Sequence, residues 1–180
     1  MKSPTLLNYA LYQIGWIAAV VGAGQGHPWL GMGVALALLV GHLVLARRRR
    51  SELRLVVAAG LTGLAIDSTQ AAVGLLSFPS GVVVSWLCPP WIVVMWMQFA
   101  STFRFSLRWL VGRPLRALIF GAVGGPLAYV IGERLGAVEL GSPRVVSLLV
   151  LSLAWTVAVP TLAWLAGRDR HAGYRLPLIY

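Results

Sequence analysis

Six apolar stretches separated by short polar segments divide the chain, and each is about 17 to 22 residues long. They cover residues 6–23, 29–45, 55–76, 89–107, 115–135 and 145–165. A helix of about 20 apolar residues crosses the hydrocarbon core of a bilayer. Lipid offers no partner for open backbone groups, and the runs are too long and continuous for barrel strands. The pattern therefore predicts an all-α, polytopic membrane helix bundle of about six transmembrane helices, with residues 1–180 forming one integral membrane domain.

The composition agrees with a membrane location. Hydrophobic residues make up 58% of the 180 residues and charged residues only 11%, whereas about 25% of a soluble domain is charged. A single soluble core of this size could not bury so much apolar surface. The excess must face another apolar phase, and we take the lipid bilayer to be that partner.

The charge is strongly basic, with fifteen Lys and Arg against five Asp and Glu. The basic residues form short clusters between the apolar stretches, which is how membrane proteins set their orientation rather than how they bind nucleic acid. With the N and C termini in the cytoplasm, six helices place thirteen of the fifteen basic residues inside and leave only Arg134 and Arg144 outside. The pattern predicts a multi-pass protein of the bacterial inner membrane with no nucleic-acid partner.

Asp67 is the residue that most strongly suggests a function within the membrane. At about 1.5 Å per residue it lies roughly 18 Å from the inner edge of the hydrocarbon. An ionised carboxylate there costs about 2.5 to 3.5 kcal/mol, so Asp67 should point inward and find hydrogen-bond partners. Gln70 is one turn away on the same helix face. Gln98 and Gln13 lie at depths of roughly 14 and 10 Å from the same inner edge of the hydrocarbon. We predict an intramembrane polar site of Asp67, Gln70, Gln98 and Gln13, with a structural hydrogen bond between helices as the alternative.

Other polar residues indicate less specific roles. Arg104 and Arg108 lie one turn apart at the end of the fourth stretch and could hold a lipid head group, although snorkelling towards the interface together with a role in topology is the explanation that we favour. Arg104 is too shallow to pair with Asp67. His42 has no second ligand at a recognisable spacing, Cys88 has no cysteine neighbour, and no phosphate loop or catalytic motif is present. The sequence therefore predicts no metal and no cofactor.

Glycines and the connection between the third and fourth stretches also carry predictions. Gly121 with Gly125, and Gly132 with Gly136, are spaced for close helix approach, and we expect packing inside the bundle rather than a dimer interface. The connection at 77–88 is mostly apolar. We expect it to lie along the membrane interface or to dip into it.

Four segments read together resemble one family of small bacterial inner-membrane proteins, the domain-of-unknown-function family 2878. They are NYALYQIGW (8–16), GLAIDSTQ (63–70), PPWIVVMWMQFASTFRFSLRWL (89–110) and GAVGGPLAYVIGERLGAV (121–138). Where relatives carry an asparagine–histidine pair before SLRWL, this chain carries Arg104 and Phe105. The resemblance implies an uncharacterised polytopic protein. Family members often lie beside genes for fatty-acid-modifying methyltransferases and oxidoreductases, which implies a lipid-associated role but no residue roles.

Three functional hypotheses follow. The first is a non-enzymatic membrane component of a lipid or fatty-acid modification or stress pathway, which works with soluble lipid-modifying enzymes at the cytoplasmic face. The second is a small transporter or lipid translocator with a proton-titratable Asp67. The third is an intramembrane enzyme acting on a lipid or quinone, with Asp67 as acid or base. The lack of catalytic motifs favours a protein that is not an enzyme.

Overall fold

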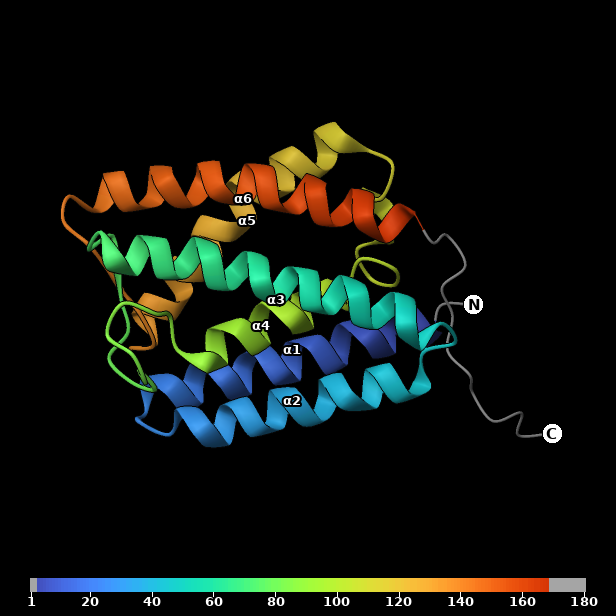
Figure 1. Ribbon diagram of the computed structural model, residues 1–180, viewed down its shortest axis with the longest axis horizontal. Coiled ribbons are helices and arrows are strands. Elements are labelled where there is room, and N and C mark those ends of the chain that lie inside the picture. Colours follow the sequence, from blue (N-terminus) through green and yellow to red (C-terminus); the bar gives the residue numbers. More distant parts are fainter. Residues whose placement is uncertain (1–2, 169–180) are drawn as a thin grey trace.

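The computed structural model describes residues 3–168, which form six α-helices, two short strands and one 3-10 helix (Figure 1). The helices are α1 (Ser3–Gly24), α2 (Pro28–Leu45), α3 (Arg49–Ala72), α4 (Pro90–Ala100), α5 (Pro114–Arg134) and α6 (Arg144–Gly167). The strands are β1 (Leu76–Ser77) and β2 (Glu139–Leu140), and η1 spans Arg108–Leu110. The predicted all-α bundle is confirmed. Within the described residues, all helices except α4 are long and apolar enough to cross a membrane.

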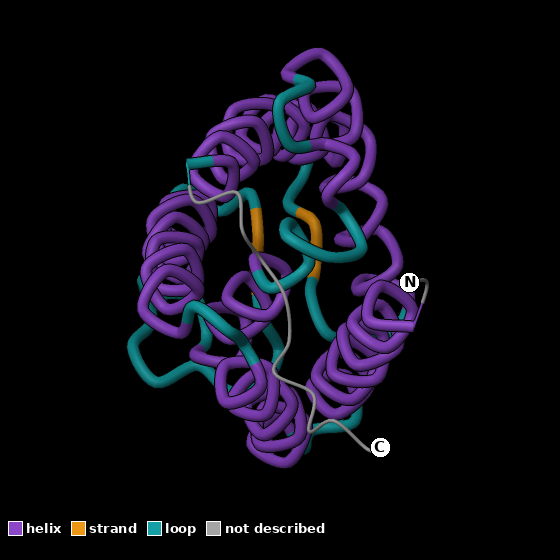
Figure 2. The backbone as a smooth tube through the Cα atoms, turned by 90° about the vertical axis from the view of Figure 1, so that its right-hand side faces the viewer, coloured by secondary structure: helices purple, strands orange, loops and turns teal. Residues whose placement is uncertain are grey.

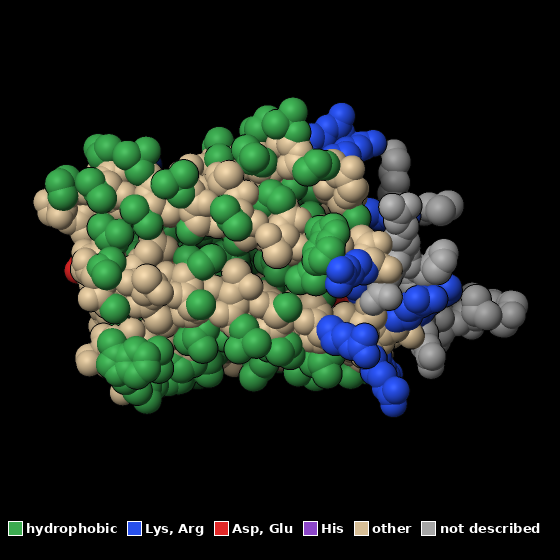
Figure 3. Space-filling view, turned by 45° about the horizontal axis from the view of Figure 1, so that its top comes forward, with side chains coloured by type: hydrophobic (Ala, Val, Ile, Leu, Met, Phe, Trp, Pro, Cys, Tyr) green, Lys and Arg blue, Asp and Glu red, His purple; other side chains and the backbone are tan. Residues whose placement is uncertain are grey.

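The outer faces of the long helices are apolar and exposed, as expected where lipid replaces water. On α6, Leu149, Leu153 and Val157 recur every four residues, and each side chain is well over half exposed. Hydrophobic side chains likewise cover much of the surface seen in Figure 3. In water such continuous apolar surface would be unfavourable, so the exterior is compatible with a multi-pass membrane protein.

The fourth apolar stretch is the one that departs from the predicted spans. We expected one helix over residues 89–107, but α4 ends at Ala100 and tight turns follow to η1. The hydroxyls of Ser101 and Thr102 donate to the carbonyls of Gln98 and Phe99, both at 2.6 Å, and the backbone continues with bonds to the third preceding residue. Such local hydrogen bonds compete with the α-helical ladder. Mean hydropathy averages residue types over the segment, so it does not reveal these local hydrogen bonds. The segment is largely buried.

The short helix α4 lies inside the bundle. It packs against α1, α2 and α3, and most of its residues are buried. Seen along the bundle, the long helices surround α4 and the connecting loops (Figure 2). Helices α1 and α2 form one tightly packed hairpin, and α5 and α6 form another. A polar residue on α4 is therefore held away from lipid, which makes this helix the centre of the candidate site.

Helix α5 approaches α6 through glycine, as predicted. A Cβ atom at Gly121 would overlap the backbone of Trp155, and one at Gly125 would overlap its indole ring. The predicted internal packing is confirmed for this pair. Gly136 follows α5 with φ +77°, a left-handed conformation that glycine adopts without strain. The second pair thus has a different use, since Gly136 belongs to a turn rather than to a helix face.

The two ends of the bundle differ in charge. The α2–α3 turn, the α4–α5 connection and the end of α6 lie at one end of the bundle, here called the basic end (Figure 1). Lys and Arg side chains gather at this end in Figure 3. Lys2, Arg170 and Arg175 lie outside the described residues. At the opposite end, Arg144 pairs with Glu133 at 2.7 Å. There β1 and β2 pair antiparallel and join the α3–α4 connection to the α5–α6 connection.

Candidate functional site

Asp67 lies on α3 in the centre of the bundle with no exposed surface. The Tyr129 hydroxyl of α5 donates to Asp67 Oδ1 at 2.6 Å, and the Trp96 indole N–H of α4 donates to Oδ2 at 2.7 Å. Gly63 lies one turn before Asp67, and a Cβ there would overlap the Trp96 ring. The glycine therefore makes room for the indole that reaches the carboxyl group. We call Asp67, Trp96 and Tyr129 the Asp67 cluster.

Within residues 3–168, no hydrogen bond joins Asp67 to any of the three glutamines that we expected around it, Gln13, Gln70 and Gln98. Gln98 reaches across to α1, where its Nε2 lies 3.5 Å from the Leu11 carbonyl, and its side chain covers Gly15. Gln70 bonds back to the Ile66 carbonyl at 3.5 Å. The hydrogen bonds to Asp67 come instead from Trp96 and Tyr129. Asp67 therefore accepts hydrogen bonds from an indole and a phenol instead of from the amides that we expected.

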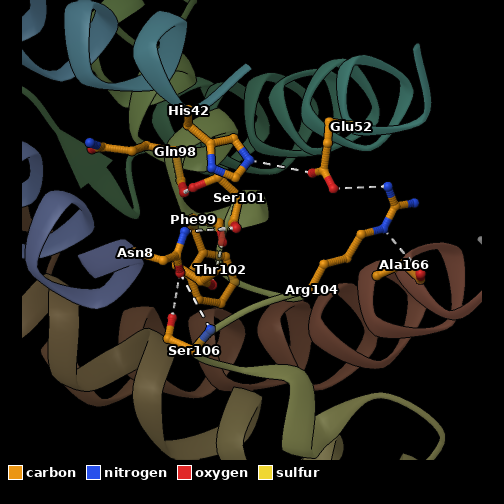
Figure 4. A network of polar contacts seen from close by, with 10 residues as sticks. All are labelled: Asn8, His42, Glu52, Gln98, Phe99, Ser101, Thr102, Arg104, Ser106 and Ala166. Atoms are coloured by element: carbon orange, nitrogen blue, oxygen red, sulfur yellow. Dashed lines mark hydrogen bonds and ion pairs between the residues drawn. The ribbon is translucent and has the colours of Figure 1, made fainter. Parts of the chain in front are cut away.

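A second buried polar group lies towards the basic end, where the turns after α4 meet α1 (Figure 4). Asn8 donates through Nδ2 to the Ser101 carbonyl at 3.2 Å. Its Oδ1 accepts from the Ser106 hydroxyl at 2.8 Å and from the Ser106 backbone N–H at 3.4 Å. One side chain therefore bonds backbone or side-chain groups at both ends of the non-helical segment. This holds the segment in place where the helix has ended.

Beside it, Glu52 bridges two basic side chains (Figure 4). Its Oε1 lies 3.1 Å from Arg104 Nη1 and its Oε2 lies 3.4 Å from His42 Nε2, with all three side chains 5% exposed or less. Arg104 also donates through Nε to the Ala166 carbonyl of α6 at 3.2 Å. Removing either partner of a buried pair leaves an uncompensated charge, which makes such a bridge a strong constraint on geometry. Arg104 thereby ties α3 and α6 to the turns after α4.

A cavity of about 550 Å³ opens next to this bridge, and we call it the basic cavity. Four arginines line it, namely Arg104, Arg108, Arg113 and Arg168. The apolar part of the wall includes Phe103, Leu110, Val111, Ala117, Ala163 and Trp164. The Arg168 guanidinium stacks over the Trp164 ring, 3.7 Å from its centroid. Glu52 contacts one member of this set, Arg104. The four arginines give the wall a positive charge beside its apolar part, so the site favours an anion with an apolar portion.

The structure relates the predicted residues in two ways. Arg104 and Arg108, predicted as a head-group pair, do line one cavity, although Arg104 is buried and bound to Glu52 whereas Arg108 is exposed. Asp67 lies in a separate cluster. Sequence reasoning missed Glu52, Trp96 and Tyr129 as polar partners. Glu52 sits at the start of a helix among arginines, where a carboxylate is ordinary, and indole and phenol groups in apolar stretches resemble packing residues.

We also searched the described part of the chain for a possible metal centre. In residues 3–168, no three His, Cys, Asp or Glu side chains lie together in a way that could hold a metal ion. What the arrangement offers is a hydrogen-bonded carboxyl group at the centre and an arginine-lined cavity at one end. The first is suited to fixing helices, and the second to binding an anionic group.

The fold and these sites define a class: a small helical protein with several membrane-compatible helices, the buried Asp67 cluster at its centre and the basic cavity at one end. Residues 5–161 match the family model described as protein of unknown function (DUF2878). The chain belongs to this family, as the resemblance implied. No significant match to a curated protein or to a solved structure was found.

Proposed function

We propose that this chain is a multi-pass protein of the bacterial inner membrane that binds the anionic head group of a lipid in its basic cavity, as a non-enzymatic component of a lipid- or fatty-acid-modifying pathway. The observation that carries the proposal is the cavity of about 550 Å³ with four arginines in its wall. This volume lies within the range of about 300 to 1,000 Å³ that is typical of small-molecule sites.

The wall chemistry supports a lipid rather than a fully water-soluble anion. Arg108, Arg113 and Arg168 offer planar guanidinium groups that bind phosphate or carboxylate oxygens in a bidentate manner. Phe103, Leu110 and Trp164 provide apolar contacts in the same wall. A molecule with an anionic head and an acyl chain satisfies both kinds of group. A free inorganic anion would leave the apolar part of the wall without a partner.

The proposal also fixes an orientation. Loops at the cytoplasmic side of a membrane protein carry an excess of Lys and Arg, so the basic end faces the cytoplasm. There, anionic lipids attract basic segments by about 1 kcal/mol per charge. A soluble lipid-modifying enzyme would meet the bound lipid at this face. The protein would then hold or present the lipid while the partner performs the chemistry.

The two alternative functions have less support. Both need a ligand, proton or water to reach Asp67, but Asp67 has no exposed surface and each of its oxygens accepts a hydrogen bond. A proton-titratable gate needs a hydrated path, and an acid–base catalyst must lie within hydrogen-bond reach of its substrate. The Asp67 cluster is therefore better explained as a contact that holds α3, α4 and α5 together.

The binding test uses the full chain in nanodiscs made from phosphatidylcholine with a minor amount of phosphatidylglycerol. Native mass spectrometry after gentle extraction counts the lipids that remain bound. We expect retained phosphatidylglycerol in the unaltered protein and at least tenfold less in the Arg108→Gln/Arg113→Gln variant. The matched control is Arg54→Gln/Arg116→Gln, which removes two exposed arginines of the same end that do not line the cavity.

Three results would contradict the proposal. Equal loss of lipid in both double variants would mean that general surface charge, rather than the cavity, holds the lipid. No enrichment of phosphatidylglycerol in the unaltered protein would remove the lipid site altogether. Inorganic phosphate that stabilises the detergent-solubilised protein as well as phosphatidylglycerol does would identify the occupant as a soluble anion.

A cellular test addresses the pathway. Whole-cell fatty acids and lipids are profiled by mass spectrometry in a deletion strain complemented with the unaltered gene, the Arg108→Gln/Arg113→Gln variant or the Arg54→Gln/Arg116→Gln control, all expressed equally. We expect the deletion to change an acyl modification and the cavity variant to leave it unrestored. An unchanged profile in the deletion strain would rule out the lipid pathway under those conditions.

A further inference from the structure

A second cavity lies within the membrane-spanning part of the bundle, where α1, α4, α5 and α6 meet, and we call it the aromatic cavity. Its volume is about 70 Å³, and it shares no lining residue with the basic cavity. Aliphatic side chains and seven aromatic rings form its wall; the rings are Tyr12, Trp16, Trp91, Trp96, Phe99, Tyr129 and Trp155. Such a concentration of rings favours a flat ligand, because aromatic faces and edges pack well against one another.

One buried polar group in this wall has no hydrogen-bond partner within residues 3–168. The indole nitrogen of Trp155 is buried and forms no hydrogen bond within the described residues. The other two buried indoles of the wall are satisfied: Trp96 donates to Asp67 at 2.7 Å, and Trp91 donates to the Ser80 carbonyl at 3.3 Å. An unmet buried donor is unfavourable and unusual in native proteins. The Trp155 N–H therefore marks a place for a hydrogen-bond acceptor.

Packing holds the Trp155 ring in place. It lies against Trp96 with ring centroids 4.5 Å apart and an interplanar angle of 33°, and against Phe99 at 5.4 Å. The ring also covers Gly125, where a Cβ would overlap it. An indole fixed on two sides cannot turn easily to find a partner of its own. The acceptor must instead come to it.

Water is a poor candidate for this acceptor. A buried water needs two to four polar partners, whereas the wall is formed mainly by aromatic and aliphatic carbon. The phenol of Tyr129 and the indole of Trp96 are already committed to Asp67. A ligand that offers one acceptor and is otherwise flat and apolar fits better.

We infer that the aromatic cavity binds the carbonyl edge of a membrane quinone, with a ring carbonyl accepting a hydrogen bond from Trp155 Nε1. Its volume is about half of the roughly 150 Å³ that holds a benzene molecule, so only one edge of the ring enters. The rest of the ring and its apolar tail extend past the half-buried Tyr12 and Trp16 of α1 and Ala128 of α5. Helices α1 and α5 approach each other closely at the end where Gly24 meets Leu135, but they share few contacts along their length, so the wall between them is the side on which a tail can reach lipid.

The inference concerns binding alone and is independent of the head-group proposal, since a different cavity and different residues carry it. The test measures the affinity of the detergent-solubilised full chain for decylubiquinone, by native mass spectrometry across a concentration series. Trp155→Phe keeps an aromatic ring and removes the N–H donor, and we expect affinity to fall about tenfold. Trp86→Phe is the matched control because Trp86 is exposed in the α3–α4 connection, and its affinity should be unchanged.

A second pair of variants tests the cavity without touching tryptophan. Ala128→Leu fills the aromatic cavity and should abolish binding, while Val123→Leu on the exposed face of α5 should leave it intact. Decylbenzene has the ring and tail but no carbonyl, so it should compete poorly. The inference is overturned if Trp155→Phe binds as Trp86→Phe does, if Ala128→Leu retains full affinity, or if decylbenzene competes as well as the quinone. Should Trp155→Phe fail to fold, the Ala128→Leu result decides.

Discussion

The phenol of Tyr129 and the carboxyl group of Asp67 meet at 2.6 Å across 62 positions of sequence, and both side chains are buried. This contact joins α3 to the hairpin of α5 and α6, because Tyr129 belongs to α5 and Asp67 to α3. Trp96 of α4 is the third member of the cluster and donates its indole N–H to the same carboxyl group. The cluster therefore has consequences for stability that can be measured without knowing the ligand.

Replacing Tyr129 with phenylalanine should destabilise the protein. The change removes one donor and leaves Asp67 Oδ1 buried without a partner, which costs about 1 to 3 kcal/mol. We expect a lower midpoint of thermal unfolding in detergent, measured by size-exclusion chromatography of heated samples. Tyr9→Phe is the control, since Tyr9 is exposed. Equal midpoints for the two variants would show that the hydrogen bond contributes nothing to stability.

The Glu52–Arg104 bridge should behave as a buried ion pair. Arg104→Gln leaves Glu52 buried without its arginine, so we expect a loss of about 3 to 5 kcal/mol. The exposed counterpart is Arg144, whose pair with Glu133 should contribute less than about 1 kcal/mol, so Arg144→Gln serves as the comparison. Reversible unfolding in mixed detergent micelles measures both. A loss for Arg104→Gln as small as that for Arg144→Gln would contradict the structural role of the bridge.

A double variant sharpens this prediction. If the loss in Arg104→Gln arises from the unpaired carboxylate, Glu52→Gln/Arg104→Gln should be more stable than the sum of the single changes predicts. Strict additivity of the two losses would mean that the side chains act independently, despite their separation of 3.1 Å.

Gly121 should not tolerate alanine, although alanine is the better helix former. A Cβ at Gly121 would overlap the Trp155 backbone, whereas one at Gly124 would meet only the Phe120 ring at 3.6 Å. We expect Gly121→Ala to cost about 1 to 3 kcal/mol through overpacking. Gly124→Ala should be neutral or stabilising by up to about 1 kcal/mol, from helix propensity. Unfolding midpoints that rank the two variants in the opposite order would argue against this α5–α6 packing.

The Cys88 thiol should react slowly, and its reaction rate should keep rising to a higher pH than that of an ordinary thiol. Burial raises the pKa of Cys88 to about 11, with the nearby Asp67 charge acting in the same direction and the Ser68 hydroxyl opposing it. The thiolate is the reactive form, so below this pKa alkylation by iodoacetamide should accelerate about tenfold per pH unit up to about pH 10. Rates measured by mass spectrometry between pH 7 and 10 test this.

The control for the thiol experiment is an exposed thiol in the same connection. Ser85→Cys in a Cys88→Ser background places one where the chain is exposed, and its rate should level off near pH 8.5 to 9. If the native thiol levels off at the same pH, Cys88 is more accessible than the fold implies.

The sequence by itself was enough to determine the class of protein and the main elements. Five of the six predicted spans are long helices, and the arginines of the α2–α3 turn, the α4–α5 connection and the end of α6 gather at one end, as the charge pattern predicted. These features depend on properties that act residue by residue along the chain, namely hydropathy over about 20 positions and charge between spans. The family assignment rests on the same linear information.

Only the tertiary structure decided which side chains meet. Depth along a helix axis suggested Gln98 as a partner for Asp67, yet depth leaves rotation about that axis open. Trp96 and Gln98 are two residues apart, about 200° around α4, so the rotation that points Trp96 at Asp67 turns Gln98 towards α1. Packing set that rotation, through Gly63 beneath the Trp96 ring and Gly15 beneath Gln98. The end of α4 at Ala100 and both cavities likewise depend on contacts between distant segments, which a linear pattern of apolar residues does not contain.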